Sequence, residues 1–116
     1  MPQAMPSRKL AVLTCMDTRI DPLAALGLTT GEAVILRNAG ARLSDDVLES
    51  LELAQRFLGV ERVLVLAHSD CRAAAANGGP ADPAQRARAT AAQLGSSGLA
   101  AEAAVYDVET GSVSSA

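Results

Sequence analysis

The chain has few aromatic side chains, few cysteines and a single histidine. Of its 116 residues only Phe57 and Tyr106 are aromatic, and there is no tryptophan. Hydrophobic residues still make up 49% of the chain, which is typical of a globular protein and not of a disordered one. The core must therefore consist of aliphatic side chains and alanine. Because such a core is poor in large side chains, we expect a subunit interface to supply part of the burial.

Long apolar runs and a strong net charge are also absent. No apolar run approaches the roughly 20 residues that a membrane span needs. The formal net charge of −3 argues against nucleic acid or an anionic membrane as a partner. The segment Met1–Lys9 contains prolines and no apolar signal region, so we expect a cytoplasmic location. The length predicts one domain over residues 1–116.

The only two cysteines and the only histidine each follow a short apolar segment. Cys15 follows Lys9–Thr14, whereas His68 and Cys71 follow Arg62–Ala67. Thiolate and imidazole are preferred ligands of Zn²⁺, and three protein ligands leave a fourth position for chemistry. The two cysteines could instead form a disulfide, but in a reducing cytosol a metal site is the better interpretation.

Short apolar runs predict strands, and cap residues predict helices between them. The predicted strands are Leu10–Leu13, Ala33–Leu36, Val63–Leu66 and Ala103–Val108. A turn at residues 109–111 would lead the last strand into a short hairpin with Ser112 and Val113. The tail, residues 114–116, is expected to fray.

Three helices are predicted from their caps. Asp21 and Pro22 open a short helix, Pro22–Leu26, which Gly27 ends. Asp82 and Pro83 open an alanine-rich helix that reaches about Leu94. Ser44 caps the longest helix, which ends near Leu58 and carries an apolar stripe for core or interface packing: Val47, Leu48, Leu51, Ala54, Phe57 and Leu58.

This alternation predicts an α/β fold with a mainly parallel sheet of about four strands, flanked by helices, and a C-terminal hairpin or edge strand. In such folds ligands bind beyond the carboxyl ends of the strands. Polar and metal-binding side chains cluster at or just past those ends, namely Cys15, Asp17, Arg19, Arg37, His68 and Cys71.

The spacing of these residues suggests one site. His68 and Cys71 lie three residues apart, so both side chains can reach one ion, and Cys15 would come from a neighbouring strand. Asp17 and Arg19 alternate with Cys15, so in an extended segment the three side chains point the same way. Asp17 could be a fourth zinc ligand or could orient a zinc-bound hydroxide. Arg19 could hold Asp17 through a bidentate ion pair.

Three separated motifs resemble the signature blocks of β-class carbonic anhydrases. They are Cys15-Met16-Asp17-Thr18-Arg19, Arg37-Asn38-Ala39-Gly40 and His68-Ser69-Asp70-Cys71, and residues 105–111 are similar to the family's late strand and turn. Their order along the chain makes the match specific.

The resemblance implies a single zinc-binding domain of the β-carbonic anhydrase fold. It implies one Zn²⁺ per chain held by Cys15, His68 and Cys71, and an Asp17–Arg19 dyad. The implied reaction is the reversible hydration of carbon dioxide to bicarbonate by a zinc-bound hydroxide, which is a lyase activity. The resemblance also implies a homodimer or higher homo-oligomer with sites near the subunit interface.

The chain departs from the family pattern at several points. Arg72 stands where the family usually has glycine, and few residues precede the first strand. The stretch between Cys71 and Val105 is short, and no second histidine is present to shuttle protons. Arg56, Arg86 and Arg88 are interpreted as solvated surface residues.

The next motif offers weaker candidates for substrate binding: Arg37, Asn38 and Gly40. Arg37 and Asn38 are more easily explained as residues that stabilise loops, and Gly40 as a residue needed for backbone geometry. Three alternatives stay open: a hydrolase of a related heterocumulene such as carbonyl sulfide or carbon disulfide, a non-catalytic zinc-binding protein, and a cysteine-nucleophile enzyme. The last is weaker, since a neutral thiol needs a base.

Overall fold

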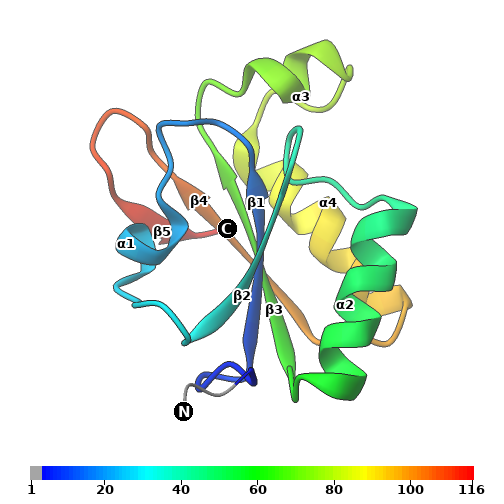
Figure 1. Cartoon of the computed structure of the whole chain (residues 1–116). Coiled ribbons are helices and arrows are strands. Elements are labelled where there is room, and N and C mark those ends of the chain that lie inside the picture. Colours follow the sequence, from blue (N-terminus) through cyan, green and yellow to red (C-terminus); the bar gives the residue numbers. More distant parts are fainter. Residues whose placement is uncertain (1–3) are drawn as a thin grey trace.

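The computed structural model describes residues 4–116 as an α/β fold with a five-stranded, mostly parallel sheet between helices (Figure 1). The start of the segment Met1–Lys9, residues 1–3, lies outside the described residues. The strands follow in the order β2-β1-β3-β4-β5 across the sheet. The first four are parallel and β5 is antiparallel to β4. Their bounds are β1 Leu10–Cys15, β2 Ala33–Asn38, β3 Arg62–His68, β4 Ala101–Tyr106 and β5 Val113–Ser115. The predicted fold class is confirmed.

The helices begin at the caps that the sequence indicates. Asp21, Ser44 and Asp82 each accept a hydrogen bond from a backbone N–H in the first turn of the helix that follows. The described helices are α1 Pro22–Leu26, α2 Asp45–Phe57, α3 Arg72–Ala76 and α4 Pro83–Ser96.

The predicted C-terminal hairpin is present, but one expectation about local structure is wrong and one helix was missed. The tail does not fray, because residues 113–115 pair with β4 and the Ala116 N–H donates to the Ala103 carbonyl oxygen at 3.0 Å. Without this pairing β4 would present unpaired backbone groups at a sheet edge. The helix α3 was not predicted either. Its N-cap is Cys71, whose sulfur accepts from the Ala74 N–H, and cysteine is not a usual capping signal.

Alternation along each strand divides the core between the two faces of the sheet. Helices α2 and α4 cover one face, whereas the short α1 lies on the other (Figure 1). In β1, Ala11 and Leu13 belong to the cluster under α2 and α4, and Val12 belongs to the cluster on the opposite face. On that second face Leu10, Ile35 and Leu64 stay only partly buried.

The stripe on α2 is buried in part. Val47, Leu51 and Ala54 face the sheet, but Phe57 is 66% exposed. Phe57 is the last residue of the helix, and the Arg56 guanidinium carbon lies 5.8 Å from the centre of its ring. The side chain of Phe57 is therefore not part of the core of this chain.

The strand order explains where the polar motifs meet. β1 pairs with β2 on one side and with β3 on the other, so the direction of chain progression reverses at β1. The segments that leave the carboxyl ends of β1 and β3 diverge there, which is where open parallel sheets bind ligands. Cys15 ends β1 and His68 ends β3.

Candidate metal centre

The structure brings Cys15, His68 and Cys71 together at the carboxyl end of the sheet. One ligand atom from each residue lies within 4.8 Å of the other two, and the two Sγ atoms are 3.8 Å apart. Cys15 and His68 are buried, and Cys71 is half-buried. Two sulfurs and an imidazole nitrogen at these separations form a ligand set that suits Zn²⁺.

The imidazole of His68 has one ring nitrogen available to coordinate a cation. Its Nδ1 donates to the Ser69 carbonyl oxygen at 2.6 Å, so the lone pair of the neutral ring is on Nε2. Nε2 is buried, and among the described residues it has no hydrogen-bond partner. Burial of a polar atom without a partner is costly. A metal ion coordinated by Nε2 would remove that cost, so these residues fit the metal that the motif suggests.

Backbone N–H groups point at both sulfurs. The Gly40 N–H donates to Cys15 Sγ at 3.4 Å, and the Ala74 N–H donates to Cys71 Sγ at 3.3 Å. Gly40 adopts a φ of 91°, a left-handed conformation that suits glycine. Hydrogen bonds of this kind stabilise negative charge on sulfur.

The protonation of the cluster depends on the cation. Burial lowers the pKa of His68, which favours the neutral imidazole that a metal requires. Burial also raises the pKa of the Cys71 thiol, against the effect of the Ala74 N–H. A bound divalent cation reverses this preference, because a coordinating thiol loses its proton.

Asp17 lies beside the cluster and is held by Arg19. Arg19 Nε donates to Asp17 Oδ1 at 3.0 Å and Nη2 donates to Oδ2 at 2.7 Å, which is the bidentate pair that the sequence suggested. These hydrogen bonds hold the pKa of Asp17 well below its usual range. Asp17 Oδ2 is 3.9 Å from His68 Nε2. The carboxylate is therefore ionised and close to the place where a metal would be bound.

Arg19 also contacts the loop after β3. Its Nη1 donates to Asp70 Oδ2 at 3.2 Å, and its Nη2 donates to the Asp70 carbonyl oxygen at 3.1 Å. Asp70 adopts a φ of 52°, which is unusual for a residue other than glycine. The contact with Arg19 joins the two motifs and could not be read from their spacing.

The Arg37 motif contacts backbone groups of the site. Arg37 donates to the carbonyl oxygens of Cys15, Asp17 and Ile20, at 2.9, 2.7 and 3.1 Å. Asn38 bonds the backbone N–H and carbonyl of Arg42 and so closes the turn that contains Gly40. These contacts stabilise the backbone around the site. The suggested role of Arg37, Asn38 and Gly40 in substrate binding remains a prediction.

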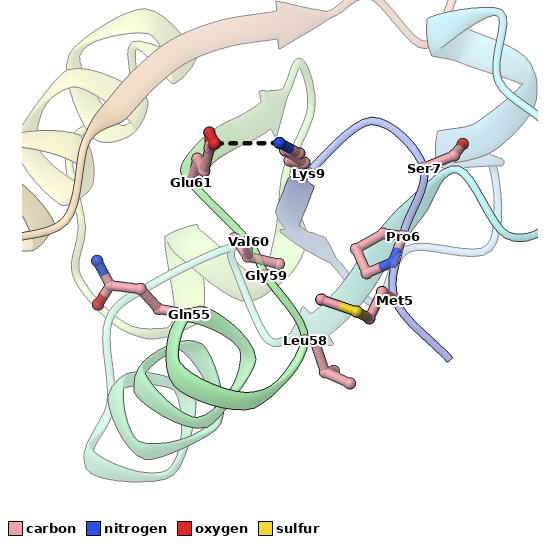
Figure 2. A pocket seen from close by; sticks show the side chains of 9 residues that line it. All are labelled: Met5, Pro6, Ser7, Lys9, Gln55, Leu58, Gly59, Val60 and Glu61. Atoms are coloured by element: carbon pink, nitrogen blue, oxygen red, sulfur yellow. Dashed lines mark ion pairs between the residues drawn. The ribbon is translucent and has the colours of Figure 1, made fainter. Parts of the chain in front are cut away.

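A shallow depression of about 390 Å³ lies over the cluster, lined by Cys15, Met16, Asp17, Thr18, Arg19, Cys71, Arg72 and Ala73. The Arg72 side chain is 89% exposed and its Nε is 3.8 Å from Asp70 Oδ1, so it borders the depression and leaves it open. A larger groove of about 850 Å³ lies at the opposite end of β1 and β3, beside the Lys9–Glu61 ion pair (Figure 2). None of the candidate metal ligands lines that groove.

The interpretation of Arg86 as a solvated surface residue is wrong. Arg86 Nη2 donates to the His68 carbonyl oxygen at 2.9 Å, and Nη1 donates to the carbonyl oxygens of Pro80 and Ala81 at 2.7 and 2.9 Å. The sequence places Arg86 in the first turn of an alanine-rich helix. Nothing in that pattern shows that the loop before the helix folds back over its side chain.

In the described part of the chain, no helix combines the length and the apolar character that crossing a bilayer requires.

Comparisons with known proteins agree with the geometry. The family model described as carbonic anhydrase matches residues 10–103. Among curated proteins, Beta-carbonic anhydrase 1 of Mycobacterium tuberculosis is 46% identical over 66 residues, which is 57% of this chain and 40% of that protein. A carbon disulfide hydrolase of Saccharolobus solfataricus is 42% identical over 64 residues, covering 55% of this chain and 31% of the relative. The chain thus matches less than half the length of these relatives.

A solved structure extends the likeness to nearly the whole chain. The carbonic anhydrase of Streptococcus mutans superimposes with a TM-score of 0.86 at 31% sequence identity, covering 97% of this chain and 83% of that one. The matched family model spans most of the 116 residues and includes the three motifs that meet at the metal cluster. The chain therefore belongs to the β-carbonic anhydrase family.

Proposed function

We propose that this protein catalyses the zinc-dependent, reversible hydration of carbon dioxide to bicarbonate. The observation that carries the proposal is the buried Nε2 of His68, which has no hydrogen-bond partner among residues 4–116, in a cluster with two cysteines in a member of the carbonic anhydrase family. In this proposal residues 1–116 form one zinc-binding domain. Cys15, His68 and Cys71 hold one Zn²⁺, which when bound lowers the pKa of a coordinated water to about 7 and so supplies the nucleophile.

The chain's own residues would orient the reaction. Both oxygens of Asp17 accept hydrogen bonds from Arg19, so the carboxylate stays ionised and fixed in direction. An ionised Asp17 can accept a hydrogen bond from the attacking water and aim its lone pair at the carbon of the substrate. Because Arg19 occupies both oxygens, this arrangement favours Asp17 as an orienting acceptor over Asp17 as a fourth metal ligand.

The surroundings of the depression bear on substrate access. Arg72 and Arg19 border it, and both arginines face carboxylates of Asp17 or Asp70, so the charges around the mouth of the site are balanced. Uncharged carbon dioxide is not steered by charge, so its entry does not depend on a net charge at the mouth.

A second candidate is hydrolysis of a related heterocumulene such as carbon disulfide or carbonyl sulfide. The observation in its favour is that the carbon disulfide hydrolase of S. solfataricus is nearly as similar in the matched region as the mycobacterial carbonic anhydrase. The two chemistries share the ligand set and differ in the substrate that the pocket admits. Turnover of both substrates by one preparation separates them.

We also infer a homo-oligomer located in the cytoplasm. On the sheet face that α1 covers, Leu10, Ile35 and Leu64 are only partly buried. A second copy of the chain could bury these side chains further, which supports the oligomer. The small number of aromatic residues in the chain supports the same inference. Sedimentation of the purified chain tests the oligomer, and a monomer at all concentrations would contradict it.

The test of the proposed function is metal analysis paired with stopped-flow hydration of carbon dioxide on the same sample. We expect about one zinc per chain and hydration well above background, with activity that rises with pH. Zinc without hydration of any substrate would indicate a non-catalytic zinc protein. A marked preference for carbon disulfide or carbonyl sulfide would establish the second candidate. Full activity after removal of all metal would favour a cysteine nucleophile.

A further inference from the structure

Arg86 spans the segment that carries two of the three candidate ligands. The segment 68–81 leaves β3 at His68, passes Cys71 and α3, and returns at Pro80 and Ala81 to the start of α4. Arg86 bonds carbonyl oxygens at both of its ends, His68 on one side and Pro80 with Ala81 on the other. One guanidinium thus closes this segment into a loop.

The three hydrogen bonds to carbonyl oxygens explain why the residue at position 86 is an arginine. The rigid fork of a guanidinium can bond several carbonyl oxygens at fixed angles, which a single ammonium cannot match. In the described residues Arg86 makes no ion pair with a carboxylate, and its Nε is buried without a hydrogen-bond partner. Burying part of an unpaired cation is unfavourable, so the three carbonyl bonds offset a real cost.

Arg86 lies close to both His68 and Cys71. The carbonyl that it bonds at 2.9 Å belongs to His68 itself, and the next carbonyl, that of Ser69, accepts from His68 Nδ1. Arg86 and Cys71 also line the same depression of about 310 Å³. Arg86 therefore holds the backbone of His68 directly before the Ser69 carbonyl to which the imidazole is bonded.

We propose that Arg86 is a positioning residue for the metal centre. It closes the 68–81 segment so that His68 Nε2 and Cys71 Sγ are already directed at Cys15 before a metal is bound. The inference rests on the metal-binding part of the proposed function. It predicts that Arg86 raises zinc affinity without touching the metal, because groups that orient ligands typically contribute about 10- to 100-fold to metal affinity.

The test uses three variants of the full chain. Arg86→Met keeps the aliphatic stem and removes every donor, whereas Arg86→Lys keeps the charge and loses the fork. Arg88→Met is the matched control, because Arg88 is an exposed arginine on the same helix. For each variant we would measure the zinc dissociation constant by competition with a chelating dye, the melting temperature, and the imidazole ¹⁵N signals. The last measurement is unambiguous because His68 is the only histidine.

The expected results distinguish positioning from a general structural role. Arg86→Met should weaken zinc binding by about tenfold or more, and should shift or broaden the His68 signals toward a mixture of tautomers. Arg86→Lys should restore part of the affinity, and Arg88→Met should match the unchanged protein. A lower melting temperature in Arg86→Met with unchanged zinc affinity and imidazole signals would overturn the proposal. If Arg86→Met does not fold, wild-type affinity and signals in Arg86→Lys would overturn it equally.

The outcome also separates this inference from the proposed function. If the unchanged protein binds no zinc, the proposed function fails, while the imidazole signals of the metal-free variants still report on Arg86. If the unchanged protein binds zinc and both Arg86 variants bind it equally well, only the inference about Arg86 fails.

Discussion

The sulfur atoms of Cys15 and Cys71 lie 3.8 Å apart, although the two residues are 56 positions apart in the chain. Parallel pairing of β1 with β3, in which Thr14 stands opposite Leu66, brings the ends of the two strands to the same level. The buried Thr14 hydroxyl strengthens this register by donating to the Leu66 carbonyl oxygen at 2.8 Å. Two sulfurs this close repel each other once ionised, so the arrangement favours a cation between them.

Cys71→Ser should remove most of the zinc and destabilise the fold. A serine hydroxyl does not ionise near neutral pH and is a poor zinc ligand, and metal binding is coupled to folding. Metal analysis after dialysis and a thermal melt measure the two effects. Ala75→Ser, an exposed position on the same short helix, is the control and should keep its metal. Unchanged zinc content in Cys71→Ser would show that Cys71 is not a ligand.

Asp17→Asn should keep zinc and lose most of the hydration rate. The amide keeps the size of the side chain but loses the charge that Arg19 orients, so it cannot accept from the attacking water in the same way. We expect kcat/KM to fall about a hundredfold or more, the usual range for a positioned acid–base group. Asp46→Asn, on the exposed first turn of α2, serves as the control. A variant at full rate would refute the role of Asp17.

The Asp17–Arg19 pair should stabilise the fold at neutral pH and lose that effect in acid. Hydrogen bonds from Arg19 hold the pKa of Asp17 well below its usual range, so the unfolded state binds the proton more readily. The contribution is therefore present above the unfolded pKa of about 3.9 and is lost as pH falls toward the folded value. In ¹³C NMR the Asp17 carboxyl should titrate well below pH 3.9 in the native protein. Arg19→Met should raise its pKa, and equal values in both proteins would contradict the ion pair.

Gly40→Ala should weaken zinc binding as well as the fold. The φ of 91° disfavours any side chain, at a cost of about 1–2 kcal/mol. Relief of that strain would move the N–H that donates to Cys15 Sγ. Gly31, at a φ of 93°, is the matched control, because a Cβ there meets nothing within 4 Å. We expect similar losses in urea unfolding for Gly40→Ala and Gly31→Ala, but weaker zinc binding only for Gly40→Ala. Equal zinc affinities would show that the Gly40 N–H does not support the site.

Local signals were sufficient for most of the secondary structure. Asp21, Ser44 and Asp82 precede proline or acidic first turns, and the structure starts a helix after each of them. These signals act over a few residues, so they can be read from the chain alone. The C-terminal hairpin was predicted, but its extension to residues 114–116 could not be read in this way, because this segment is too short and too polar to form a strand unless an edge is already present.

The residues of the candidate site could be named from the sequence. The two cysteines, the histidine and the motifs around them suggested a metal site, and the order of the motifs resembled one family. Only the tertiary structure decided how the site is held together. The bonds of Arg19 to Asp70 and of Arg86 to His68 join residues 51 and 18 positions apart. Such contacts depend on how loops fold over the sheet edge, and no local pattern encodes them.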